Sequence, residues 1–191
     1  MNDVITIGGA ITGRITYLRP NQINVEITSP YQGITSGRHI PYFSMRPGRK
    51  RFEEMTEKGA MITDYGIERA KEILQEIYDA CHYIESNLAS LKPECSRRWQ
   101  EVLASHAGED FLDKAAFTQE KKRIKAAWKA GDFDQQQYAL KIQKLHQRLR
   151  RYEKMISEAE SAIGDILYSR ANIAGIDLVS QLIYKYELHK P

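Results

Sequence analysis

Apolar and polar residues alternate one by one in two stretches near the N-terminus. Residues 11–17 hold an apolar side chain or glycine at every second position, and residues 23–27 repeat the pattern after a Pro-Asn turn. Alternation with a period of two predicts strands with one buried face, and the turn predicts a β-hairpin. Residues 4–7 and 39–43 also have the composition of strands. We therefore expect a small β module over residues 1–45, too small to be stable unless it docks on the helices.

The alternation around Gly13 and Val25 resembles that of small barrels of the KOW and SH3-like kind. The resemblance covers one hairpin and assigns no family. It implies that the β module is a small barrel, whereas the strand count alone also fits a curled sheet.

A spacing of three and four residues replaces the alternation from residue 63 onward. Apolar side chains recur at this spacing over residues 67–91 and predict a helix that ends at Pro93. A second run, over residues 138–166, keeps the spacing for four heptads. The apolar stripe of the first run is wider than a two-stranded seam, which favours a helical bundle.

Local signals mark the start of the second long helix. Gly131 can end the preceding helix, Asp134 can cap the next one, and Gln137 stands where a capping box requires it. Shorter helices are expected over residues 94–106 and 111–130. The second of these should lie antiparallel to the long helix because the connection between them is short.

Together these elements predict an α+β protein that is mostly α. A small N-terminal β-barrel-like or curled-sheet module (residues 1–45) is followed by a basic-then-acidic connector (46–62). A long antiparallel helical bundle or coiled-coil hairpin occupies residues 63–191. Within it, residues 173–186 fit either a final amphipathic helix or an added strand.

The formal net charge of +3 conceals blocks of opposite sign. Residues 1–52 carry seven Lys or Arg against two Asp or Glu, and residues 113–155 carry twelve against five. Residues 53–112, in contrast, carry six against thirteen. Two interpretations follow. Either the acidic residues of the first long helix, such as Glu68 and Asp79, neutralise the cations of the second, or the basic surfaces bind a polyanion.

Two groups of cations are the candidate nucleic-acid contacts, because phosphates attract Lys and Arg and aromatic rings can stack on bases. The first group lies in the connector, beside Tyr42, and contains Arg46, Arg49, Lys50 and Arg51. The second follows one side of the long helix and contains Lys141, Lys144, Arg148 and Arg151.

The residue pattern predicts no catalytic centre, metal site or cofactor. Gly8 and Gly13 have the spacing of a phosphate-binding loop, but Arg14 and Ile15 stand where that motif needs Lys and then Ser or Thr. The two cysteines form neither a disulfide framework nor a metal quartet, and Cys81 falls at a core position of the first helix.

These observations favour a non-catalytic, nucleic-acid-associated accessory protein. It would bind the phosphate backbone of DNA or RNA through the β module and connector, and a protein partner or a second copy through its helices. The alternative is a coiled-coil interaction or assembly protein with no nucleic-acid role. The chain has no apolar run of the roughly 18 residues that cross a membrane and its start lacks the features of a secretory signal, so we expect a cytoplasmic protein.

Overall fold

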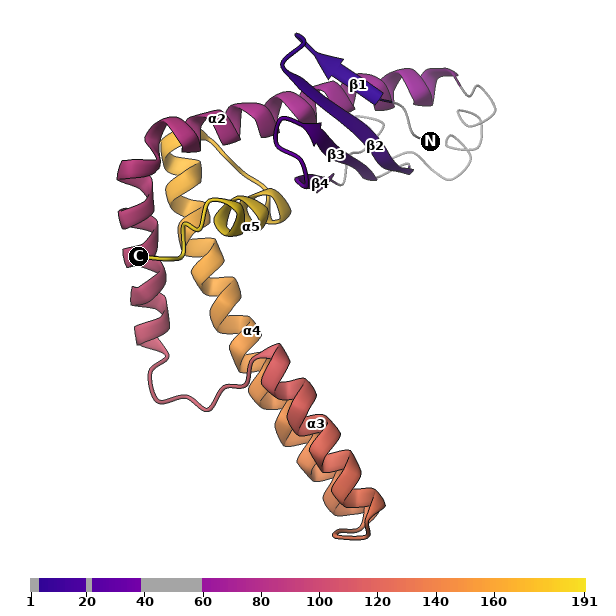
Figure 1. The fold of residues 1–191 in the computed structure, drawn as a ribbon, viewed down its shortest axis with the longest axis vertical. Helices are drawn as coiled ribbons and strands as arrows, with labels where there is room; N and C mark the ends of the chain where they lie inside the picture. The colour runs from indigo at the N-terminus through magenta and orange to yellow at the C-terminus, as the bar shows by residue number, and fades with distance from the viewer. Residues whose placement is uncertain (1–3, 20–21, 39–59) are drawn as a thin grey trace, which may run out of the picture.

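The structure is a computed structural model that describes residues 4–19, 22–38 and 60–191 (Figure 1). Over these ranges an antiparallel sheet of four strands is followed by four helices, which confirms the predicted α+β, mostly helical class. The strands are β1 (Val4–Ile7), β2 (Ile11–Arg19), β3 (Gln22–Ser29) and β4 (Thr35–Arg38). The helices are α2 (Ala60–Ser105), α3 (Lys114–Lys129), α4 (Gln135–Ala171) and α5 (Ile176–Lys185).

The strands pair in the order of the chain, each antiparallel to the next. In the predicted hairpin of β2 and β3, Ile15 lies opposite Val25, and both side chains are buried. The opposite face is polar, and there Arg14 Nη2 lies 2.6 Å from Glu26 Oε2. The alternation along the hairpin therefore separates a buried face from an exposed one, as the sequence predicts.

The sheet is open rather than closed into a barrel. Among the described residues β1 pairs only with β2, and β4 pairs only with β3, so no hydrogen bonds join the two edges. The first part of α2 packs against β1, β2 and β3 and covers the apolar face that closure would otherwise bury. Residues 39–43, which the sequence predicts as a further strand, lie outside the described residues.

At Gly13 the sheet lies close against α2. A Cβ atom at this position would overlap Cδ2 of Leu74 and lie 3.0 Å from the backbone oxygen of Glu26. Leu74 itself is fully buried. Glycine therefore allows β2 to pass directly over the helix at this point.

One apolar core joins the sheet to the helices, so the β module docks as expected. Its fully buried side chains from the sheet and α2 include Ile15, Ile27, Leu74, Ile77 and Ile84. Those from the later helices include Ile163, Leu167 and Leu182. α5 resolves the ambiguity over residues 173–186 in favour of a helix.

α2 continues through Pro93 to its end at Ser105, so the prediction that Pro93 ends a helix is wrong. A proline inside a helix removes one backbone hydrogen bond and clashes with the preceding turn, which bends a helix that other contacts hold in place. Figure 1 shows α2 changing direction sharply part-way along its length. Leu91 and Cys95, on either side of the proline, are both fully buried and fix the two parts of the helix.

α3 and the first half of α4 form an antiparallel hairpin that projects away from the rest of the molecule (Figure 1). We call residues 114–152 the arm. Its turn has the predicted capping box, in which Asp134 accepts a hydrogen bond from the backbone of Gln137 at 2.8 Å and the Gln137 side chain accepts one in return at 3.2 Å. Near the turn, the rings of Trp128 and Tyr138 stack with their centroids 4.7 Å apart. No residue of α3 is fully buried, so the arm is a thin structure with little core of its own.

Candidate nucleic-acid interface

The cations predicted on the long helix lie on the arm. Lys141, Lys144 and Arg151 are exposed, and none forms an ion pair with another described residue. Arg148 is half-buried and binds Asp110 through Nε at 2.9 Å and through Nη2 at 2.7 Å. The stripe therefore offers three unpaired positive charges to solvent, while its fourth member fastens the arm to the segment before α3.

The acidic residues of α2 do not neutralise this stripe. Glu68 pairs with Lys71 at 2.7 Å, and Glu72 pairs with Arg69. Each pair joins positions three apart on the same helix, where the partners meet without any change of fold. Asp79 accepts a hydrogen bond from a glutamine one turn earlier. The arm projects away from this part of α2 (Figure 1), so the acidic residues of its first part do not neutralise the cations of the stripe.

The other helix of the arm adds further exposed cations. Lys121, Lys122 and Lys125 form no ion pair with the described residues. Lys121 Nζ lies 5.4 Å from the centroid of the Phe117 ring, a contact that leaves its charge intact. Asp113 caps α3 and Asp134 caps α4. Two of the five acidic residues within residues 113–155 are therefore helix N-caps. The arm is therefore a concentrated positive surface.

The base of the arm is fastened by an elbow, residues 106–113, between α2 and α3. His106 Nδ1 lies 2.8 Å from Glu109 Oε1, and Nε2 lies 2.7 Å from Glu158 Oε2 on α4. A neutral imidazole donates from one nitrogen only, so both contacts are hydrogen bonds when the ring is protonated. Hydrogen bonding to Glu158, and then to Glu109, raises the pKa of His106, and the imidazolium lowers the pKa of Glu158.

The elbow should consequently be most stable in mildly acidic solution. The contribution of His106 is complete below its ordinary pKa of 6.5 and is lost as the pH rises through its raised pKa in the folded protein. The contribution of Glu158 is present above its ordinary pKa of 4.5 and is lost as the pH falls through its lowered pKa. Hydrogen exchange of the elbow amides, corrected for the intrinsic rate, should be slowest between these two values.

The variant His106→Gln should remove this pH dependence, whereas His82→Gln, a change at an exposed position of α2, should retain it. An NMR titration that finds His106 at its ordinary pKa would contradict the geometry.

The predicted contacts in and beside the connector lie outside the described residues. These are Tyr42, Arg46, Arg49, Lys50 and Arg51, and their contribution remains a prediction. In the described part of the β module, the exposed face of β2 and β3 carries Arg14, which Glu26 already neutralises. The positive surface that the structure describes is therefore that of the arm.

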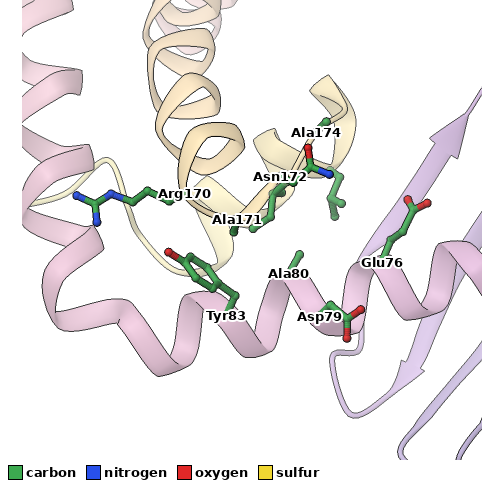
Figure 2. A pocket seen from close by; sticks show the side chains of 10 residues that line it. Glu76, Asp79, Ala80, Tyr83, Arg170, Ala171, Asn172 and Ala174 are labelled. Atoms are coloured by element: carbon green, nitrogen blue, oxygen red, sulfur yellow. The ribbon is translucent and has the colours of Figure 1, made fainter.

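A pocket of about 590 Å³ opens where α2 meets the connection between α4 and α5 (Figure 2). Its charged side chains are already engaged. Glu76 lies 3.6 Å from Arg69, and Arg170 lies 2.5 Å from Glu94. Figure 2 shows the carboxylates of Glu76 and Asp79 pointing apart. An active site needs ionisable groups that converge on one point, and these do not.

The two thiols are also poor candidates for chemistry. Cys81 and Cys95 are both buried and unpaired. Burial raises the pKa of Cys95 to about 11 and raises that of Cys81 as well, so both remain protonated at neutral pH. Among the described residues, no group of three His, Cys, Asp or Glu side chains could hold a metal ion. In the same part of the chain, every helix is too short or too polar to cross a lipid bilayer.

No protein-family model, curated protein or solved structure matches the chain. The arm, with its exposed and unpaired cations, is the feature on which a function can be based.

Proposed function

We propose that the protein is a non-catalytic nucleic-acid-binding protein whose arm lies along a phosphate backbone. The observation that supports this proposal is the row formed by Lys141, Lys144 and Arg151, exposed and without ion pairs among the described residues. Glu68 and Glu72 of α2 do not neutralise this row, because each pairs with a cation of α2 itself. Cations that stay unpaired within a folded protein are available to displace the counterions of a polyanion.

The dimensions of the stripe suit a nucleic-acid strand. From residue 141 to residue 151 the helix rises roughly 15 Å, at 1.5 Å per residue. One strand of duplex DNA places a phosphate about every 3.4 Å along its axis, so the stripe faces roughly four phosphates. Lysines act as point charges and contact the backbone rather than base edges, so we expect binding that does not depend on sequence. In this proposal the connector cations, Arg46–Arg51, extend the contact.

The proposal is tested by the salt dependence of binding to a fluorescent duplex DNA. For the variant in which Lys141, Lys144 and Arg151 are all alanine, the slope of log K against log salt should fall by about 2.7, or about 0.9 for each lost phosphate contact. Affinity in about 0.1 M salt should fall by at least roughly tenfold. Circular dichroism should show unchanged helicity, since the three positions are exposed.

A second triple variant controls for net charge. Lys71, Lys185 and Lys190 are exposed or half-buried cations outside the arm, and their replacement by alanine removes the same total charge. This control should retain most of the salt slope. The proposal fails if the wild-type protein forms no complex at low salt, or if the two triple variants lose affinity equally.

We further propose, as a second part of the function, that the helices bind a protein partner. The observation that favours it is the exposure of large apolar side chains on α4 and α5, among them Tyr168 and Ile176. Such side chains gathered on one surface are typical of protein contacts. This part is independent of the arm, so a variant that loses nucleic-acid binding should keep its partner.

A further inference from the structure

A groove runs along α4, and α5 forms its second wall. It consists of two hollows of about 310 and 740 Å³, which adjoin because Ser157 and Glu160 line both. Together they extend from Tyr152 to Tyr168 on α4, a rise of roughly 24 Å at 1.5 Å per residue. The groove therefore has the length of about four turns of helix.

Exposed apolar side chains gather along this groove. Ile176 is 85% exposed, Tyr168 is 59% exposed and Tyr184 is 48% exposed. Five large hydrophobic residues are exposed in the described part of the chain, and these three line the same groove. Between them, Ser161 and Gly164 give the α4 wall little side-chain bulk. Exposed apolar side chains that gather in this way are typical of a binding site, whereas single exposed apolar side chains are common on any protein surface.

The charges along the groove are mainly negative. Its lining contains one basic residue, Lys114, and four acidic residues: Asp113, Glu153, Glu160 and Asp165. Glu160 accepts a hydrogen bond from Ser180 at 3.0 Å, which fixes its carboxylate between the two walls. Burial, together with this carboxylate, raises the pKa of Tyr184 to about 12, so the phenol stays neutral beside the acid. The groove therefore combines apolar contacts with a fixed negative potential.

We propose that this groove binds an amphipathic helix of a partner protein whose apolar face is flanked by Lys and Arg. An apolar groove of this length is suited to receive the apolar face of one helix, with side chains three and four positions apart as anchors. The acidic lining selects basic flanks. A second copy docked through the same groove would place acidic residues against acidic residues, which disfavours self-association. The inference rests on the second part of the proposed function and specifies its surface and partner chemistry.

Two synthetic peptides test the proposal on the full-length protein. Both are helices of about 18 residues with the same leucine face, and they differ only in lysine or glutamate on the flanks. Fluorescence anisotropy in the absence of nucleic acid should show that the lysine peptide binds at least about tenfold more tightly than the glutamate peptide. The proposal is overturned if the two bind equally, or if neither binds at about 100 μM peptide.

Matched variants locate the binding site. Ser161→Trp fills the groove and should weaken binding of the lysine peptide at least about tenfold. Ser169→Trp makes the same change at an exposed position of α4 outside the groove and should leave binding unchanged. Asp165→Lys should also weaken binding of the lysine peptide. If Ser161→Trp leaves binding unchanged, the groove is not the site and the proposal falls.

Two further measurements separate this proposal from its alternatives. The triple alanine variant of the arm should lose affinity for duplex DNA and keep its affinity for the lysine peptide. Ser161→Trp should keep its affinity for duplex DNA and lose affinity for the lysine peptide. Light scattering of the wild-type protein and of Ser161→Trp reports on self-association. A wild-type dimer that becomes a monomer in Ser161→Trp would assign the groove to a second copy and overturn the basic partner helix.

Discussion

Replacing Leu74 with aspartate is expected to destabilise the whole protein strongly. Leu74 is fully buried where β2 crosses α2 at Gly13, inside the core that joins the sheet to α2, α4 and α5. A buried carboxylate without a partner destabilises a protein by about 3–5 kcal/mol. A domain of this kind has a total free energy of unfolding of only about 5–15 kcal/mol. Thermal unfolding followed by circular dichroism should therefore show a strongly lowered or missing transition.

The control for this prediction is Ala89→Asp, which places the same carboxylate at an exposed position of the same helix. Because only helix propensity changes there, the free energy of unfolding should fall by less than about 1 kcal/mol. Leu74→Ala should be intermediate, at about 2–5 kcal/mol, because it leaves a cavity without a charge. Similar transitions for Leu74→Asp and Ala89→Asp would mean that the sheet does not pack on α2 at this point.

The features that the sequence predicts correctly are those set by neighbouring residues. Alternation over residues 11–17 and 23–27 places Ile15 and Val25 on one buried face, because successive side chains of a strand point to opposite sides. The capping box of Asp134 and Gln137 forms as expected, because both partners lie within four positions of each other. Such contacts cost little chain entropy and depend weakly on the rest of the fold.

Pro93 and the choice between a barrel and a curled sheet show what the local sequence pattern does not determine. A proline within a helix interior costs roughly 3 kcal/mol, which from the sequence alone predicts a helix end. In the structure, burial of Leu91 and Cys95 on either side offsets that cost, and the helix bends instead. Alternation likewise identifies the buried face of the sheet but not what covers it. Here the covering element is α2, so the two sheet edges need not meet.

The candidate interface, too, can be predicted from the sequence only in part. The spacing of Lys141, Lys144 and Arg151 on one side of a helix is visible in the sequence. The sequence does not show that these cations form no ion pairs, because that depends on where the fold places the acidic residues of α2. His106 and Glu158 meet across 52 positions, and Arg148 and Asp110 meet across 38. Nothing in residue spacing identifies such pairs, so the elbow that fastens the arm emerges only from the structure.

Replacing Leu145 with aspartate is expected to unfold the arm while the core stays folded. Leu145 is 3% exposed and lies outside the apolar core that joins the sheet to the helices. α3, the other helix of the arm, has no fully buried residue of its own. A buried charge costs several kcal/mol, which exceeds the stability that a two-helix hairpin with so little core can have. Regions with few buried contacts unfold locally without global unfolding.

Hydrogen exchange measured by mass spectrometry separates local from global unfolding. In Leu145→Asp, peptides from residues 114–152 should exchange rapidly, while peptides from the first part of α2 keep their protection and the main thermal transition is retained. Affinity for duplex DNA should fall at least as far as in the triple alanine variant, because the cations lose their common helix. Lys144→Asp, one position away and exposed, should keep the arm protected and lower the salt slope by about one. Equal protection of the arm in both variants would show that Leu145 does not hold α3 against α4.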